Sequence, residues 1–491
     1  MRTPTIIQGG MGVGVSSWQL AREVSLAGEL GVVSGTALDA VLARKLQDGD
    51  PGGHVRRALE HFPSPAMVDR VMKKYYCAGG LSPGTPYRPH PMLSIDPKDE
   101  VIDLSLLGNF VEVWLAKEGH DGVVGINLLE KIQMANPSAA LGAMLADIDY
   151  VLMGAGIPRE IPRLLTDFAA HQPGGLTIDI EDATRKHRSV LDPVAALGAD
   201  LPPLRRPKFL AIVSLHVLAN YLNRDDEIRP DGFVVEGPAA GGHSAPPRGK
   251  VNLDDDGQPV YTDKDLADIA KMADIGLPFW MAGAYNTPAQ VAAVKQAGAA
   301  GIQVGTLFAL SEESGLRPDL RHRLMDNLRT ETLIVRNDPR ASPTGFPFKV
   351  ATLPGTLSEH HVYEQRDRIC DLGYLRIGYE KSDGRLGYRC ASEPLHMFAK
   401  KGGDEADTVG RKCLCNALMA DIGMGQTRKG GYVEQPAVTL GQDLTGPRQL
   451  LALHPDGWTA RTVVEWLLSD VPTEQTKAWH ADVRERSSDR V

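Results

Sequence analysis

Eight short runs of β-branched and other apolar residues recur along the first 305 positions, and helical patterns separate several of them. The runs cover residues 4–8, 31–35, 122–127, 150–154, 209–213, 232–236, 278–282 and 301–305. Their hydrophobicity is continuous rather than alternating, which is typical of strands buried on both faces of a parallel sheet. Eight such strands with helical crossovers predict an α/β fold, a (β/α)8 TIM barrel, with a doubly wound open sheet as the second choice.

Capping residues mark the starts of two helices in this repeat. Ser16 or Ser17 is placed to cap a helix over residues 17–27. Thr287 followed by Pro288 is typical of a helix start, because threonine caps well and proline suits the first helical position.

The barrel is expected over residues 1–330, with two insertions in it. The first covers about residues 36–121, after the second strand, and connections this long are usually functional or independently structured. The second covers about residues 174–207, where residues 176–180 are a candidate extra strand. From residue 331 to 491 the pattern changes to proline-rich turns and short strand-like runs, which indicates a C-terminal extension packed on the barrel.

Composition excludes several classes of function. Of the 491 residues, 42% are hydrophobic and 23% are charged, as in a globular enzyme. The formal net charge of −9, with no basic stripe, argues against a nucleic-acid partner. No long apolar window predicts a membrane span, and the first strand starts too near Met1 to leave room for a signal peptide. Five cysteines fit a reducing cytoplasm better than a disulfide framework.

The sixth run continues into small residues, two glycines and a histidine: Glu236, then Gly237 to Ala240, then Gly241, Gly242 and His243. Glycine lets backbone N–H groups approach a flat ligand that a Cβ atom would hold away. Histidine moves protons near neutral pH without large tuning of its pKa. The run therefore favours a ligand site with His243 at its mouth, and the alternative is a glycine turn followed by an incidental surface histidine.

Small residues also follow the first, seventh and eighth strands. They are Gly9, Gly10 and Met11 after Gln8, then Ala282, Gly283 and Ala284, and finally Gly305 and Thr306. In a barrel, active sites lie at the carboxyl ends of the strands, and the loops after strands seven and eight commonly bind a phosphate. We therefore expect these loops to hold a cofactor phosphate; ordinary tight turns are the alternative. Asn127 ends the third strand, and its carboxamide offers a donor and an acceptor that match the edge of a flavin ring. The alternative is that Asn127 caps a helix.

Two other patterns are weaker. The glycines at 10, 12 and 14 do not have the spacing of a dinucleotide-binding fingerprint. Cys413 and Cys415, with Cys370 and Cys390 upstream, suggest zinc, but a Cys-x-Cys pair lacks the usual ligand spacing and 413–422 resembles an apolar helix. Buried thiols are the preferred interpretation, and no metal site is predicted.

Taken in order, these motifs resemble the nitronate monooxygenase (2-nitropropane dioxygenase-like) family of FMN-dependent TIM barrels. The residues that carry the resemblance are 7–11, 125–129, 236–243, 282–284 and 301–306. The family is similar to FMN-dependent enoyl-acyl-carrier-protein reductases and to the enoyl reductases of polyunsaturated fatty acid and polyketide synthases. Residues 243–249, 342–349 and 413–416 look most like that synthase-associated branch.

The resemblance implies roles for individual residues. It makes His243 catalytic and implies FMN as cofactor, bound by Gln8, Gly9, Gly10, Met11, Asn127, Glu236, Gly241, Gly242, Ala282, Gly283, Ala284, Gly305 and Thr306. Three positions depart from the family pattern. Gly9-Gly10-Met11 replaces Ala-Pro-Met, Ala239 replaces a glutamate, and Ala284 replaces a glycine. The first two departures affect the expected substrate pocket, and the third affects the expected phosphate-binding loop.

The leading hypothesis for function is oxidation of alkyl nitronates or nitroalkanes with O2 through a flavin semiquinone, with His243 as base. The second is NAD(P)H-dependent reduction of an enoyl thioester in a fatty acid or polyketide synthase system. The third is a non-catalytic flavoprotein subunit of a larger synthase. The partners expected are a small-molecule substrate and either O2 or NAD(P)H, and a homodimer is one option for assembly.

Overall fold

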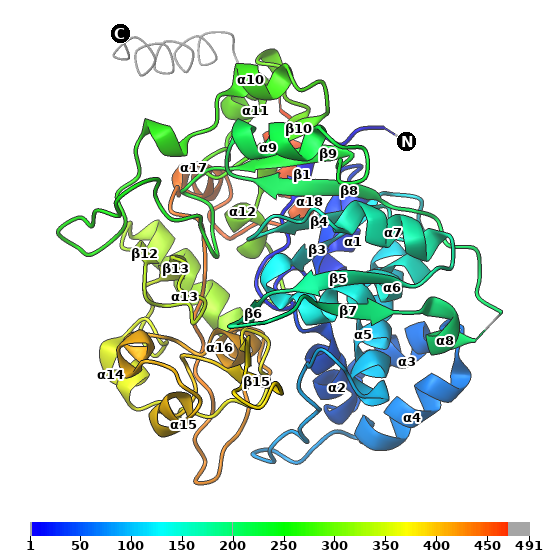
Figure 1. The fold of residues 1–491 in the computed structure, drawn as a ribbon. Helices are drawn as coiled ribbons and strands as arrows, with labels where there is room; N and C mark the ends of the chain where they lie inside the picture. Colours follow the sequence, from blue (N-terminus) through cyan, green and yellow to red (C-terminus); the bar gives the residue numbers. More distant parts are fainter. Residues whose placement is uncertain (1, 199, 470–491) are drawn as a thin grey trace.

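The computed structural model describes residues 2–198 and 200–469, and at its centre lies one sheet of eight parallel strands (Figure 1). The strand order is β1-β11-β10-β9-β8-β4-β3-β2. The strands are β1 (Ile6–Gln8), β2 (Gly31–Ser34), β3 (Val124–Leu129), β4 (Tyr150–Gly154), β8 (Lys208–Val213), β9 (Gly232–Glu236), β10 (Phe279–Ala282) and β11 (Gly301–Val304). All eight predicted runs are therefore strands.

The sheet closes between β1 and β2. Ile7 forms a parallel bridge with Leu30, and the Gln8 backbone N–H donates to the Leu30 carbonyl at 3.0 Å. The Gln8 side chain completes the seam, because its Oε1 accepts from the Val32 backbone N–H at 2.9 Å. Closure makes the sheet a (β/α)8 barrel and excludes the open doubly wound sheet.

Both faces of the strands are buried, as their continuous hydrophobicity predicts. One set of side chains fills the barrel interior: Ile7, Leu30, Val32, Tyr150, Leu152, Leu210, Val234, Trp280 and Ala282. Alternate residues, such as Ile6, Val33 and Val235, pack outward in the larger core beneath the helices. The strands are thus fixed by apolar burial on both sides.

The helices around the barrel begin where capping residues are found. Ser17 caps α1 (Trp18–Leu26) and accepts from the Leu20 N–H, while Thr287 and Gln290 form a capping box at α11 (Pro288–Gln296). Both predicted helix starts are confirmed. The other helices of this part are α6 (Asn136–Leu145), α7 (Ile161–Ala169), α9 (His216–Asn223), α10 (Ile269–Ala273), α12 (Thr306–Ala309) and α13 (Pro318–Arg329).

The two insertions have their own secondary structure. The first is helical and contains α2 (Leu38–Gln47), α3 (His54–Leu59), α4 (Pro65–Tyr75) and α5 (Asp99–Lys117), of which α5 packs against α1, α2 and α6. In the second, β5 (Gly174–Ile178) pairs antiparallel with β7 (His187–Leu191), and β6 (Ile180–Glu181) and α8 (Pro193–Leu197) complete it. The predicted extra strand is therefore split between β5 and β6.

The chain after residue 330 is joined to the barrel at several points. β12 (Val335–Asp338) and β13 (Phe348–Ala351) form a hairpin, while β14 (Ile377–Glu380) pairs with β15 (Leu386–Arg389) and with β6. Its helices are α14 (His360–Glu364), α15 (Leu395–Lys400), α16 (Leu414–Asp421), α17 (Thr445–Leu453) and α18 (Ala460–Leu467). In Figure 1, α17 and α18 return to the barrel, and α18 contacts α1 and α11. We propose on this basis that the chain from residue 331 is an extension packed on the barrel; of the expected range 331–491, residues 470–491 lie outside the described part.

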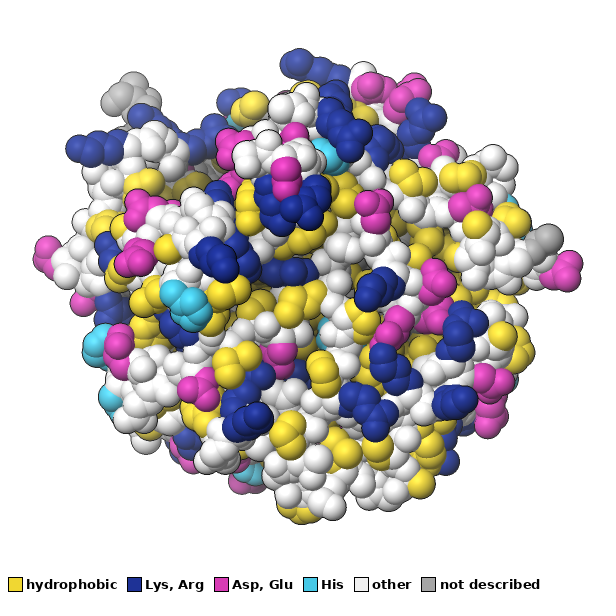
Figure 2. All heavy atoms as spheres, turned by 60° about the horizontal axis from the view of Figure 1, so that its bottom comes forward, with side chains coloured by type: hydrophobic (Ala, Val, Ile, Leu, Met, Phe, Trp, Pro, Cys, Tyr) yellow, Lys and Arg dark blue, Asp and Glu magenta, His cyan; other side chains and the backbone are white. Residues whose placement is uncertain are grey.

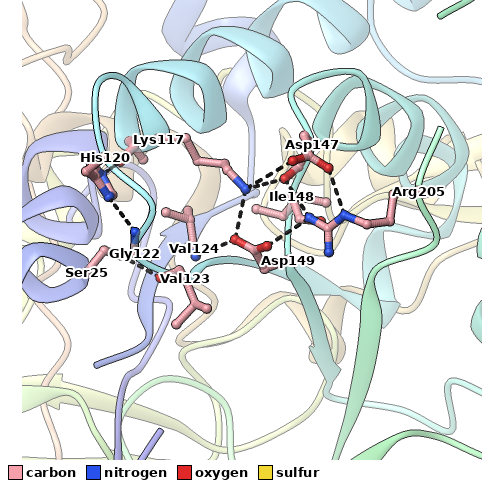
Figure 3. Close-up of polar contacts among 11 residues, drawn as sticks. Ser25, Lys117, His120, Gly122, Val123, Val124, Asp147, Ile148, Asp149 and Arg205 are labelled. Carbon is pink, nitrogen blue, oxygen red and sulfur yellow. Dashed lines mark hydrogen bonds and ion pairs between the residues drawn. The ribbon is translucent and has the colours of Figure 1, made fainter. Parts of the chain in front are cut away.

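A charged cluster holds the amino ends of β3 and β4 together (Figure 3). Asp149 accepts from the Val124 backbone N–H at 3.0 Å, from Lys117 Nζ at 2.9 Å and from Arg205 Nη2 at 2.8 Å. Residues at the amino-terminal face of a barrel contribute to stability rather than to catalysis. We therefore assign this cluster a structural role.

On the face drawn in Figure 2, acidic and basic side chains are interspersed rather than gathered into one basic patch. Within the described residues, no helix combines the length and the apolar character that crossing a bilayer requires.

Candidate active site

Bare backbone from four strand ends forms a pocket at the carboxyl end of the barrel, here called the glycine pocket. Its walls come from the loops after β1, β9, β10 and β11. It gathers most of the predicted cofactor residues: Gly9, Gly10, Met11, Glu236, Gly241, Gly242, Ala282, Gly283, Ala284, Gly305 and Thr306.

A second pocket opens beside the first and is here called the histidine pocket. It shares Gly10, Glu236 and Gly242 with the glycine pocket and adds Asn127 and His243. The rest of its wall is largely apolar and includes Leu128, Leu129, Ile132, Phe348, Leu414 and Leu418. The two pockets are therefore neighbouring parts of one site at the carboxyl ends of the strands.

Glycine is required where a Cβ atom would collide with a neighbouring backbone or side-chain atom. Gly283 has φ +77°, and a Cβ there would lie 2.7 Å from the Gly237 carbonyl oxygen. A Cβ at Gly10 would lie 2.3 Å from the Asn127 Cβ. Ala284 also has positive φ, at +67°, a conformation that an alanine adopts only at a cost in free energy. The loops are thus held in conformations that keep the pocket bare.

Several polar groups in the site lack a protein partner. Among the described residues, Asn127 Oδ1 and Gln303 Oε1 are buried without a hydrogen bond, and the backbone N–H groups of Ala284 and Gly305 donate to no protein acceptor. Buried polar groups are normally paired, so these atoms mark positions for a ligand. Gln303, Ala284 and Gly305 line the glycine pocket, and Asn127 lines the histidine pocket. Amide oxygens and free N–H groups together suit a molecule with a polar ring and a phosphate.

The C-terminal extension contributes a wall that the sequence does not reveal. Thr439, Leu440 and Gly441 line the glycine pocket, and Thr439 Oγ1 accepts from the Gly242 N–H at 2.8 Å. The Gly441 N–H donates to Thr306 Oγ1 at 2.9 Å, and the Gln442 N–H donates to the Ala239 carbonyl at 2.9 Å. This segment therefore fastens the loops after β9 and β11 to each other.

Gln8 is the one predicted cofactor residue that lines neither pocket. It is fully buried, its amide nitrogen donates to the Gly9 carbonyl at 2.6 Å and to Ser16 Oγ at 2.8 Å, and its amide oxygen closes the barrel. The Gln8 side chain therefore fixes the conformation of the loop after β1.

His243 is fixed by residues of the extension. Its Nε2 lies 2.7 Å from Ser342 Oγ, and its ring packs edge-on against Phe348, with centroids 4.9 Å apart. Burial, together with the positive charge of Lys131, lowers the pKa of His243 to about 3. The expectation that this histidine needs little tuning is therefore corrected: the imidazole is neutral throughout the physiological range and is a weak base.

Glu236 lines both pockets, and its charge interacts with that of the buried Lys349. Burial raises the pKa of Glu236 to about 7, against the opposing effect of the Lys349 charge. Burial lowers the pKa of Lys349 to about 8, and its Nζ donates to the Pro238 carbonyl at 2.7 Å and to Ser244 Oγ at 3.2 Å. Lys349 therefore holds both sides of the loop that carries His243.

The closed parallel sheet and the pocket at its carboxyl end define the class of protein. The chain is a (β/α)8 barrel whose ligand site lies in the position usual for enzymes of this fold. Within it, residues 208–342 match the family model described as nitronate monooxygenase. The matched segment runs from β8 through His243 to Ser342, so the resemblance found in the sequence is confirmed there. The match and the barrel identify the chain as an oxidoreductase of the flavin-dependent kind.

Solved structures similar to the chain include FabK from Thermotoga maritima, with 16% identity over 99% of this chain and 96% of that one and a TM-score of 0.48. Nitroalkane oxidase from Streptomyces ansochromogenes has 15% identity over 96% and 97%, with a TM-score of 0.46. The enoyl reductase domain of MlnA from Bacillus amyloliquefaciens has 12% identity over 99% and 96%, with a TM-score of 0.48. A search of curated proteins finds no match to the chain.

Proposed function

We propose that the chain is an FMN-dependent oxidoreductase that oxidises alkyl nitronates with O2 at the joined glycine and histidine pockets. The observation that carries the proposal is the position of a neutral imidazole, His243, beside a bare-backbone pocket, with unpaired polar groups in the joined site. The family match over residues 208–342 supports the same reaction class.

The residues present fit FMN. Asn127 and Gln303, whose amide oxygens are buried and unpaired, would hold the polar edge of the ring. Backbone N–H groups at Gly283, Ala284, Gly305 and Thr306 would hold the phosphate. When bound, the cofactor supplies the redox chemistry, and the protein supplies orientation and electrostatics.

The positive charge of Lys131 near His243 favours the nitronate anion over the neutral nitroalkane. A histidine with a pKa of about 3 is too weak a base to remove an α-proton efficiently. Lys131 is close enough to lower the pKa of His243, and its positive charge would attract an anionic substrate. His243 then orients the substrate by hydrogen bonding, and its role as a base becomes secondary.

Oxygen uptake tests this proposal. Purified protein loaded with FMN should consume O2 with an alkyl nitronate at a rate well above that with the parent nitroalkane at the same pH. His243→Asn should retain FMN while losing nitronate turnover. Full turnover in this variant would contradict the assignment.

One observation favours a second activity, NAD(P)H-dependent reduction of an enoyl thioester. The apolar wall of the histidine pocket, with Leu129, Leu414 and Leu418, suits an acyl chain better than a small nitronate requires. Anaerobic mixing with NADPH separates the two activities, because rapid bleaching of the flavin indicates the reductase and no bleaching indicates the oxidase.

A further inference from the structure

Four of the five cysteines gather in the C-terminal extension. Cys370 follows α14, Cys390 comes directly after β15, and Cys413 and Cys415 lie at the start of α16. Cys390 and Cys413 are each 7% exposed, and the other two are half-buried. All four are free thiols, so the extension is not cross-linked by disulfides between them.

The four thiols lie near one another. Burial raises the pKa of Cys370 and of Cys415, and the charges of the other thiols in the group raise these pKa values further. Taken together with the corresponding effect of Cys413 on Cys390, every pair among the four interacts.

Hydrogen bonds fix the segments that carry these cysteines. Asn416 Nδ2 contacts both the Ile369 carbonyl, at 3.3 Å, and Cys413 Sγ, at 3.4 Å. Arg368 Nη2 donates to the Ala391 carbonyl at 2.8 Å, which ties the segment of Cys370 to that of Cys390. The convergence of the thiols is therefore built into the packing of three separate segments.

A single metal ion does not fit these thiols. Among the described residues, no group of three or more His, Cys, Asp or Glu side chains is arranged to hold one ion. A zinc ion needs every sulfur about 2.3 Å from one centre, which brings the sulfurs close together. An iron–sulfur cluster places its own iron and sulfide atoms between the cysteines and therefore takes four thiolates that are farther apart.

The surroundings of the thiols suit a buried anion. Backbone N–H groups of Ser392, Asn416 and Leu375 lower the pKa values of Cys390, Cys413 and Cys415, respectively, against the larger raising effect of burial. Hydrogen bonds to the sulfurs are one of the features by which proteins stabilise and tune iron–sulfur clusters.

Arg366 supplies an independent indication that an anion binds here. Its side chain is 6% exposed, and its Nε and Nη1 atoms are buried without a hydrogen-bond partner. Its positive charge lowers the pKa of both Cys390 and Cys413, so the guanidinium lies near their sulfurs. A buried guanidinium with unpaired N–H groups is costly, and a negatively charged cluster held by the thiolates would offset that cost.

We propose that Cys370, Cys390, Cys413 and Cys415 bind a [4Fe–4S] cluster, with Arg366 compensating its negative charge. Because Cys415 lines the histidine pocket together with Tyr374 and Leu375, the cluster lies beside the proposed flavin site. This inference does not depend on the reaction proposed above.

The test is a metal and sulfide analysis of the full chain, purified without oxygen and reconstituted with ferrous iron and sulfide. The expected result is about four iron and four acid-labile sulfide per chain, with an electron paramagnetic resonance signal after reduction by dithionite. Neither iron nor acid-labile sulfide comes from a flavin, so the result is independent of FMN binding. Bound zinc, two irons per chain, or folded protein that takes up no iron would overturn the proposal.

Two serine variants provide the matched comparison. Cys413→Ser should lose the iron and the sulfide, whereas Cys77→Ser, which removes the fifth cysteine from the loop after α4, should keep both. Equal iron and sulfide in the two variants would overturn the assignment. If Cys413→Ser fails to fold, the reconstituted wild-type chain decides the question, because its metal content requires no variant.

Discussion

Replacing Ser342 with alanine tests whether the extension positions His243. Ser342 is fully buried, and its hydroxyl contacts His243 Nε2 at 2.7 Å and Thr344 Oγ1 at 2.8 Å. Ser342→Ala removes one hydrogen bond, worth about 0.5–1.5 kcal/mol net, and leaves a buried ring nitrogen unpaired, at a cost of about 1–3 kcal/mol. Because about 1.4 kcal/mol corresponds to a tenfold change, we expect kcat for the nitronate to fall at least about tenfold.

Ser25→Ala is the matched control for this variant. Ser25 is 2% exposed, and its hydroxyl donates to the Val123 carbonyl at 2.6 Å at the opposite end of the barrel (Figure 3). Urea unfolding should show a loss of about 1 kcal/mol or more in both variants, because each loses a buried hydrogen bond. Only Ser342→Ala should lose turnover while retaining FMN. Equal turnover in the two variants would refute the positioning role of Ser342.

Three further results are expected. Gly283→Ala should weaken FMN binding at least tenfold in a fluorescence titration, because its Cβ would lie 2.7 Å from the Gly237 carbonyl oxygen. Gly276→Ala is the control and should not weaken FMN binding, because Gly276 has a similar φ of +81° but open space around it. Asp149→Asn should lower the free energy of unfolding by about 1.5–3 kcal/mol in urea and leave kcat unchanged, because it weakens charged hydrogen bonds far from the site. The pKa of His243 lies below its unfolded value of 6.5, so stability should fall as the pH drops from about 6.5 toward 3, and His243→Gln should flatten that slope.

The barrel is predictable from sequence because its strands are buried on both faces. Val32, Val234 and Trp280 fill the interior while their neighbours pack under helices, and such strands appear as continuous apolar runs. The same physics predicts the loops of the glycine pocket, since the carboxyl ends of the strands gather at one end of the barrel.

Long-range contacts are what the sequence does not reveal. Residues 439–441 line the glycine pocket from nearly 200 positions beyond Gly242, and no local pattern marks them. Gln8 has the polar character of a ligand-binding residue, yet its amide is used to close the barrel. The lowered pKa of His243 depends on burial and on Lys131, more than 100 positions away. Likewise, cysteine spacing alone does not show that Cys370 and Cys390 meet Cys413.

The central claim is that a flavin binds where Asn127, Gln303 and the loops of the glycine pocket leave polar groups unpaired. Titration of the folded chain with FMN, followed by flavin absorbance and fluorescence, measures this directly. The account predicts saturable binding of one FMN per chain. Folded protein that is colourless and binds no added FMN would contradict it.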